Sequence, residues 1–225
     1  MGRVTGGPFG TFIGKVGHVV GYVRLGNPWV RNLPRKSNKP RTSGQRVVNR
    51  KFQMSRKLVS DMKEFVNVSF RIAAVGTGKT AQNVASSWII KDAVIGEHPN
   101  FELDFSKVVI SKGNLPLADQ LEVEYVYPNV NFKWAVDPEL GLKRNRDQVM
   151  MMAYHPNWER SYSVLSGNRR SVGEDQLSVR FKADYGETNP EEDFLETYIA
   201  FISDDRTEIS DSIYTGRVYC KQLLN

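Results

Sequence analysis

The segment whose residue types best fit phosphate chemistry is Gly76-Thr77-Gly78-Lys79-Thr80. It resembles the end of a P-loop, in which backbone N–H groups and a lysine bind phosphates. A complete P-loop has a glycine at the position of Ala73, and it follows a buried strand, whereas a helical pattern precedes this segment. We therefore interpret the segment as a loop between two helices, in which Thr80 caps the second helix.

The histidines and the single cysteine form no recognisable catalytic or metal motif. His18, His98 and His155 lack HExxH spacing, and one thiol excludes a Cys-based zinc site and an internal disulfide. We interpret the histidines as surface or loop residues and Cys220 as an apolar residue of the last strand. The acids of the strand-connecting loops match no EF-hand and are interpreted as surface acids: Asp137, Glu139, Asp147, Asp204, Asp205 and Asp211. The sequence therefore predicts no catalytic residue, metal or cofactor.

The charged residues are distributed unevenly along the chain. Residues 1–60 contain 13 lysines and arginines and no aspartate or glutamate, whereas the remaining residues carry 18 basic and 25 acidic side chains. Such asymmetry indicates a basic segment with an anionic partner, either nucleic acid or an acidic surface on a neighbouring subunit.

The densest group of cations spans an extended, proline-containing linker and the start of a predicted helix. Phosphate contacts from such a group are sensitive to salt and carry no sequence specificity, and a helix N-terminus adds a second element that attracts anions. The residues predicted to contact nucleic acid or an acidic partner are Arg35, Lys36, Lys39, Arg41, Arg46, Arg50 and Lys51.

Residues 1–41 are predicted to form a basic, glycine-rich arm and linker. The first 26 residues contain eight glycines with β-forming residues between them, which excludes a stable helix. We expect a thin β-hairpin or extended arm over residues 9–31. Two strands alone are marginal in water, and their edges favour pairing with a neighbouring subunit. The residues predicted to contact that neighbour are Phe9, Phe12, Ile13, Val16, Val19, Tyr22 and Trp29.

Residues 42–99 are predicted to form a helical hairpin. Thr42 and Gln45 have the spacing of a capping box, and an apolar stripe then continues for roughly 25 residues. This stripe consists of Val48, Phe52, Ser55, Val59, Met62 and Val66. A second helix is expected from about Ala81 to Ile95.

Residues 100–225 show the period-two pattern of β-strands. A first strand is expected from residue 101, with residues 107–111 as its continuation, and the others at residues 121–127, 131–136, 148–154, 161–165, 177–181, 195–203 and 212–220. Short antiparallel strands at this spacing predict an immunoglobulin-like β-sandwich with Trp134 and Tyr198 in its core. The predicted fold class is thus α+β: a glycine-rich β-arm and a helical hairpin followed by the sandwich.

Several runs of residues are distinctive: 12–21 (FIGKVGHVVG), 30–34 (VRNLP), 36–40 (KSNKP), 107–115 (KVVISKGNL), 198–203 (YIAFIS) and 210–216 (SDSIYTG). Together these runs resemble an uncharacterised protein family of the Bacteroidota and their phages. Residues 38–42 (NKPRT), followed by QRVVNR at 45–50, are also similar to a segment of small structural proteins of tailed phages. The first resemblance supports the domain layout and implies no activity.

These observations lead to three hypotheses. The first is a non-enzymatic structural or assembly subunit, in particular a ring, neck, tail or capsid-associated component of a phage virion. Its arm would clasp neighbours in a homo-oligomer, together with other particle proteins. The alternatives are a nucleic-acid-binding protein that uses the basic segment 31–57 and a surface adhesion module. The chain shows no membrane span and no apolar signal-peptide region, so we expect cytoplasmic synthesis, with location in the virion if a phage encodes it.

Overall fold

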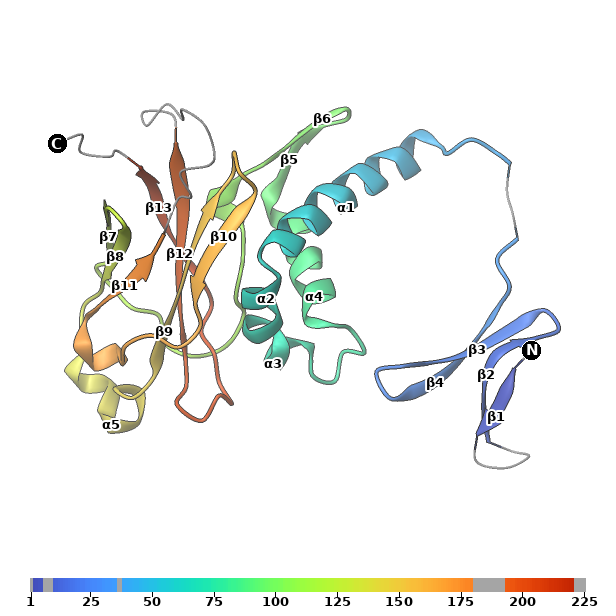
Figure 1. Ribbon diagram of the computed structural model, residues 1–225, viewed down its shortest axis with the longest axis horizontal. Helices are drawn as coiled ribbons and strands as arrows, with labels where there is room; N and C mark the ends of the chain where they lie inside the picture. The colour runs from blue at the N-terminus through green and yellow to red at the C-terminus, as the bar shows by residue number, and fades with distance from the viewer. Residues whose placement is uncertain (1, 6–9, 36–37, 180–192, 221–225) are drawn as a thin grey trace. The chain divides into compact units, whose positions relative to one another are not determined.

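The computed structural model, which describes residues 2–5, 10–35, 38–179 and 193–220, is an α+β protein (Figure 1). It divides into two compact units, which we call the N-terminal unit (Met1–Thr42) and the body (Ser43–Asn225). The boundary predicted between residues 99 and 100 falls inside the body, where helices and strands share one hydrophobic core. In the described part of the chain, no helix combines the length and the apolar character that crossing a membrane requires.

The N-terminal unit contains one antiparallel sheet with the strand order β1-β2-β3-β4. Its strands are β1 (Arg3–Thr5), β2 (Thr11–Val16), β3 (Val19–Arg24) and β4 (Asn27–Asn32). The turn between β3 and β4 has positive φ at both central residues, Leu25 (50°) and Gly26 (79°). This is the pattern of a type I′ turn, whose twist suits a tight hairpin. The structure therefore extends the predicted hairpin to four strands.

The long helix predicted from Thr42 is divided into three segments. These are α1 (Ser43–Asp61), α2 (Lys63–Ser69) and α3 (Arg71–Ala74). Hydrogen bonds of helical spacing cross both breaks, from Met62 N–H to Leu58 O and from Phe70 N–H to Val66 O, each at 3.1 Å. The predicted stripe is buried only from Ser55 onward, because Val48 and Phe52 remain 66% and 47% exposed.

The second helix begins where the sequence predicts and ends earlier. It consists of α4 (Ala81–Trp88) and a π-helical segment (Ile89–Ala93). The chain then enters a hairpin of β5 (Val94–Glu97) and β6 (Asn100–Leu103), so Ile95 is a strand residue rather than the end of the helix. The strand expected from residue 101 stops at Leu103, and a 3-10 turn follows over Phe105–Lys107.

The remaining strands of the body form two antiparallel sheets. One has the order β10-β9-β12-β13 and the other the order β11-β8-β7, with the short helix α5 (Gly141–Arg144) between β8 and β9. The strands are β7 (Glu122–Val126), β8 (Asn129–Lys133), β9 (Gln148–His155), β10 (Arg160–Val164), β11 (Glu174–Ser178), β12 (Phe194–Ile202) and β13 (Ile213–Tyr219). Each strand predicted from residue 121 onward has a counterpart within a few residues.

The four-stranded sheet of the body is the middle of three layers, between the helices and the three-stranded sheet (Figure 1). Met152 of β9 and Tyr198 of β12 pack with the helices in one core. Their neighbours Met151 and Ile199 pack in a second core with residues of β8 and β11, as does Trp134. Successive strand residues point to opposite faces, so both faces of β9 and β12 must be apolar.

Candidate interaction surfaces

One side of the sheet in the N-terminal unit, which we call the apolar face, is covered by apolar residues. Gly21 of β3 pairs with Val30 of β4, and Val23 pairs with Pro28, so these residues point to the same side. A Cβ atom at Gly21 would lie 2.7 Å from the ring of Phe12, which explains why glycine is required there. The apolar face consists of Phe12, Val16, Val19, Val23, Pro28 and Val30.

The other side of β3 and β4, with Lys15 of β2, carries cations and aromatic rings. Tyr22 pairs directly with Trp29, and Lys15 and Arg31 both pair with Val20. The guanidinium carbon of Arg31 lies 5.7 Å from the centroid of the Tyr22 ring. We call this the basic–aromatic face; its cations and rings are Lys15, Tyr22, Arg24, Trp29 and Arg31, and Val20 lies between Lys15 and Arg31.

The residues that we predicted to contact one neighbouring subunit lie on two different sides of the sheet. Phe12, Val16 and Val19 belong to the apolar face, whereas Tyr22 and Trp29 belong to the basic–aromatic face. Ile13 is 44% exposed, and Phe9 lies outside the described residues. The predicted set did not include Val23, Pro28 and Val30, which share the apolar face and are recognised as neighbours only once the register of β3 with β4 is known.

The predicted anion-binding residues extend from the N-terminal unit into α1. Arg35, Lys39 and Arg41 are exposed in the segment before the helix, and Lys36 lies outside the described residues. Arg46 and Arg50 are exposed on α1. Lys51 is half-buried and lies 5.0 Å above the Phe101 ring, so its stem is partly used in packing. Within the described residues, no carboxylate forms an ion pair with any of these arginines.

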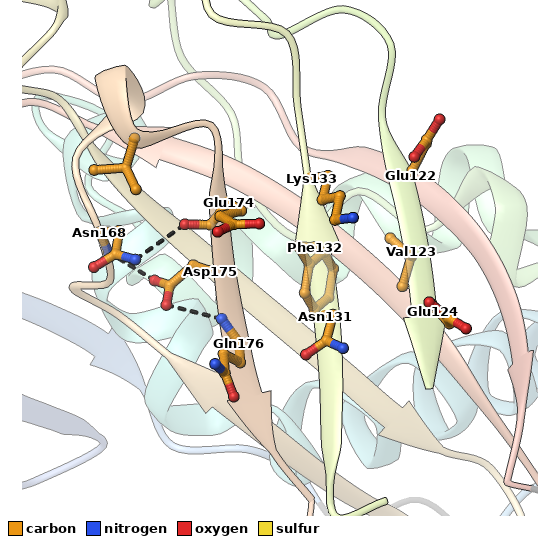
Figure 2. Close-up of a pocket in the computed structure, with 11 residues that line it drawn as sticks. Glu122, Val123, Glu124, Asn131, Phe132, Lys133, Asn168, Glu174, Asp175 and Gln176 are labelled. Carbon is orange, nitrogen blue, oxygen red and sulfur yellow. Dashed lines mark hydrogen bonds between the residues drawn. The ribbon is translucent and has the colours of Figure 1, made fainter. Parts of the chain in front are cut away.

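The outer face of the three-stranded sheet forms an acidic groove of about 580 Å³ (Figure 2). Glu174 of β11, Lys133 of β8 and Glu122 of β7 lie in one row across the strands. Gln176, Asn131 and Glu124 lie in the next row. Three carboxylates around one lysine leave this surface negative, which is the opposite sign to residues 1–60.

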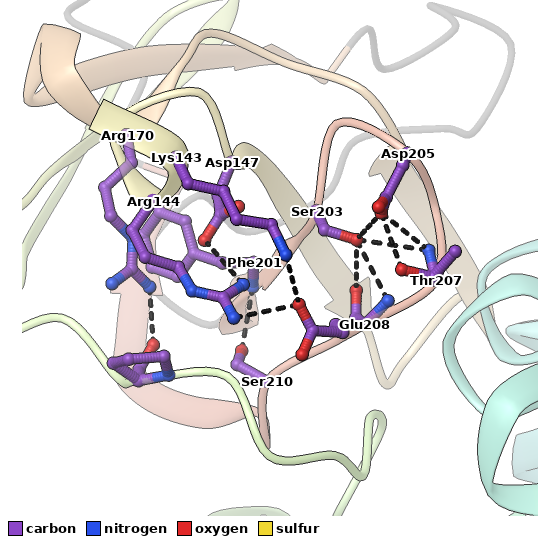
Figure 3. A network of polar contacts seen from close by, with 11 residues as sticks. Lys143, Arg144, Asp147, Arg170, Phe201, Ser203, Asp205, Thr207, Glu208 and Ser210 are labelled. Carbon is purple, nitrogen blue, oxygen red and sulfur yellow. Dashed lines mark hydrogen bonds and ion pairs between the residues drawn. The ribbon is translucent and has the colours of Figure 1, made fainter. Parts of the chain in front are cut away.

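A buried polar network joins α5, β12 and the loop that contains Arg170 (Figure 3). The Arg170 guanidinium carbon lies 3.9 Å from the centroid of Phe201, and its Nη2 donates to the carbonyl of Pro116 at 2.5 Å. Trp134 Nε1 donates to the Arg170 carbonyl at 2.8 Å. We interpret this network as structural, because Arg170 is 1% exposed and spans the loops at one end of the second core.

One of the loop acids that we interpreted as surface residues, Asp147, is buried in the structure. Its side chain is 1% exposed, and Arg144 Nη1 lies 3.8 Å from its Oδ2. Burial raises the pKa of this carboxyl, while Arg144 and Arg170 lower it. Nothing in the local sequence indicates this burial, because Asp147 directly precedes β9 at a position that also suits a surface loop.

The segment that resembles a P-loop connects two helices, as predicted. Gly76 and Gly78 adopt positive φ angles of 75° and 65°, and the preceding element is α3 rather than a strand. Thr80 Oγ1 accepts a hydrogen bond from the Asn83 N–H at 3.3 Å and caps α4. Thr80 is therefore explained by the capping of α4, and Gly76 and Gly78 by the positive φ angles of the loop.

The structure places one histidine differently from the prediction. His155 is fully buried at the end of β9, with its ring stacked 4.2 Å from Trp158 and its Nε2 3.5 Å from Asp193 Oδ1. Burial lowers the pKa of this imidazole. Cys220 is buried as predicted, and burial raises the pKa of its thiol to about 12. Among the described residues, no three His, Cys, Asp or Glu side chains are grouped so as to hold a metal ion.

The sequence of the chain matches the model of a protein family of unknown function, DUF6266, over residues 11–216. No curated protein and no solved structure shows a significant match. The matched range includes both the N-terminal sheet and nearly all of the body. The two units are therefore parts of one family architecture.

Proposed function

The chain belongs to the DUF6266 family, and we propose that it is a non-enzymatic structural subunit whose N-terminal unit joins copies of the chain into an assembly. In its most specific form, the proposal places the protein in a phage particle, as a ring, neck, tail or capsid-associated component. That step depends on the resemblance of residues 38–50 to tailed-phage structural proteins.

The observation that carries the proposal is the exposed apolar face of the N-terminal unit. Val16, Val23 and Val30 are 50%, 50% and 58% exposed, and the two cores of the body contain residues only from Val47 onward. Full burial of one such side chain contributes about 1.5–3 kcal/mol. Covering this face with a neighbouring copy would therefore stabilise both the sheet and the assembly.

The distribution of charge in the chain also supports contact between copies. Arg41, Arg46 and Arg50 are exposed, and the acidic groove on the three-stranded sheet presents Glu122, Glu124 and Glu174. A basic segment of one copy beside the acidic groove of the next would extend the contact made by the apolar face. Repeated contacts of this kind form a closed ring when the rotation from each copy to the next leads back to the first copy.

The strand order of the body supports its assignment as an immunoglobulin-like sandwich. Of the seven strands β7–β13, the first, second and fifth form one sheet, and the fourth, third, sixth and seventh form the other. This order fits a sandwich in which the fourth strand has joined the sheet of the third, sixth and seventh. We propose that the sandwich and its helical layer serve as the rigid module that the N-terminal unit connects.

The experiment is the native mass of the nuclease-treated full chain, measured by light scattering at low and high salt. We expect a defined oligomer that persists in high salt. The double variant Val23→Lys/Val30→Lys should be a monomer, whereas Leu142→Lys, at a body residue that is 84% exposed, should assemble normally. A monomeric wild-type chain under both conditions, or a double variant that still assembles, would overturn the proposal.

A second candidate function is contact with nucleic acid through the basic segment 31–57. The exposure of Arg46 and Arg50 at the start of α1 favours it, because phosphates would meet both the cations and the helix N-terminus. Arg46→Glu/Arg50→Glu/Lys51→Glu should abolish binding to duplex DNA at low salt. If the wild-type chain itself has no affinity for duplex DNA at low salt, this candidate fails.

A further inference from the structure

We propose that the basic–aromatic face of the N-terminal unit is a binding site for single-stranded nucleic acid. This site goes beyond the assembly role, because it uses the side of the sheet opposite the apolar face. It shares only Arg31 with the basic segment 31–57, and its central feature is a pair of aromatic rings, Tyr22 and Trp29.

The register of the strands brings the rings and cations together. Tyr22 and Trp29 are directly opposite each other, and Arg24 pairs with Asn27 at the turn beside them. Cβ atoms of directly paired residues lie about 4.5–5.5 Å apart, so the two rings are neighbours. Trp29 is 52% exposed, and the guanidinium of Arg31 lies over the Tyr22 ring. This face thus offers the exposed ring of Trp29 and the guanidinium of Arg31, which lies over the half-buried ring of Tyr22.

Unpaired bases have the chemistry that this arrangement recognises. A base can stack on an aromatic ring or on a guanidinium plane, while its phosphate meets a nearby lysine or arginine. Lys15, Arg24 and Arg31 surround the rings, and residues 1–60 contain no carboxylate that would oppose a phosphate. Stacking accepts any base, so the expected binding has little sequence preference.

The exposed ring of Trp29, beside the half-buried ring of Tyr22, favours a single strand over the other anionic ligands. In a duplex the flat surfaces of the bases are stacked on one another and cannot reach Trp29. An acidic protein surface would need the cations of this face but would leave the two rings without a specific role. The proposal therefore predicts that loss of the Trp29 ring weakens binding more than loss of one positive charge.

The alternation of β4 provides matched variants at neighbouring positions. Arg31 belongs to the basic–aromatic face, and the adjacent Val30 belongs to the apolar face. Arg56, which is exposed on α1, allows one positive charge to be removed elsewhere in residues 1–60. The contribution of this face can therefore be separated from that of the net charge.

The test is fluorescence anisotropy of a labelled oligothymidine of about 20 nucleotides, titrated with the full chain at low and moderate salt. Trp29→Ala should weaken binding about tenfold or more, and Trp29→Phe, which keeps a ring, should weaken it only a few-fold. Arg31→Gln should weaken binding and lower the salt dependence by about one counterion, whereas Arg56→Gln and Val30→Ala should have smaller effects.

Three results would overturn the proposal: no binding of the oligothymidine at low salt, equal affinity for a duplex of the same length, or unchanged affinity of Trp29→Ala. The Val23→Lys/Val30→Lys variant distinguishes this site from the assembly surface. It should lose the oligomer and keep oligothymidine binding by each chain, so either proposal can fail while the other stands.

Discussion

The molecule contains two antiparallel sheets of four strands whose surroundings are opposite. In the body, seven of the eight residues of β9 and eight of the nine residues of β12 are buried. In the N-terminal unit, all six residues of β4 are exposed. Equal strand number therefore does not produce equal burial, since a sheet is stabilised by the layers that cover its faces.

The residues of the two sheets already differ in the way that their surroundings require. In β9, Met150, Met151 and Met152 are buried on alternating sides, so both faces are apolar. In β4, the exposed Val30 and Arg31 point to opposite sides, so one face is apolar and the other basic. A sheet with one charged face cannot become the middle layer of a protein without burying that charge. The two faces of the N-terminal sheet are therefore the surfaces that we propose bind partners.

The largest expected effect comes from matched aromatic truncations in the two sheets. Phe201 is 1% exposed and packs edge-on against Trp134, with ring centroids 5.6 Å apart, whereas Trp29 is 52% exposed. Phe201→Ala should lower the free energy of unfolding by about 3–5 kcal/mol, because it leaves a cavity in the second core. Trp29→Ala should change the stability of the body by less than about 0.5 kcal/mol. Urea unfolding monitored by circular dichroism measures both.

If Phe201→Ala does not fold, Phe201→Leu should retain the fold with a smaller loss of stability. Equal effects of the Phe201 and Trp29 truncations on the urea midpoint of the body would show that the two sheets do not differ in the way described.

The next effect is a dependence of stability on pH that only the body should show. Burial lowers the pKa of His155 below its ordinary value of 6.5, so the unfolded chain takes up this proton at a higher pH than the folded chain. The free energy of unfolding should therefore fall as the pH falls below about 6.5, by at most about 1.4 kcal/mol per pH unit from this residue.

The variant His155→Gln should remove this contribution, so the pH dependence of wild type minus variant gives it directly. His98→Gln serves as the control, because His98 is exposed. A wild-type slope that matches that of His155→Gln between pH 5 and 6.5 would contradict the prediction.

A smaller effect is expected at the cap of α4. Thr80→Ala removes the side-chain acceptor of the Asn83 N–H, which also donates to the Thr80 carbonyl at 3.0 Å, and should lower the free energy of unfolding of the body by about 1 kcal/mol. Thr80→Ser keeps a hydroxyl at the same position and should lose much less. The urea midpoints of the two variants decide this, and equal losses would show that the cap contributes nothing.

The smallest effect is expected at the turn of the N-terminal sheet. Leu25 adopts a φ of 50°, which a leucine tolerates poorly and an asparagine adopts readily. Leu25→Asn should stabilise the hairpin of β3 and β4 by about 0.5 kcal/mol, and Leu25→Val should destabilise it. Hydrogen exchange of the β3 and β4 amides measures the change. Lower protection in Leu25→Asn would contradict the assignment of a type I′ turn.

Local pattern was sufficient to predict most of the elements of the body. Period-two alternation located the strands from β7 to β13, and the residues around Thr80 indicated both a loop and the start of α4. The absence of acids from residues 1–60 separated a basic segment from the remainder. These properties depend on residues that are neighbours along the chain, and for that reason they can be predicted without the fold.

Tertiary structure alone decided which of these patterned residues are buried. Val48 and Val59 both belong to the predicted apolar stripe of α1, yet Val48 is 66% exposed and Val59 is 1% exposed, because the stripe meets the core only in the second half of the helix. Asp147 and His155 are polar residues at strand ends that became buried for the same kind of reason. Burial depends on what lies opposite a residue, and that partner is distant in the sequence. The two faces of the N-terminal sheet likewise required the pairing of β3 with β4 before their residues could be sorted.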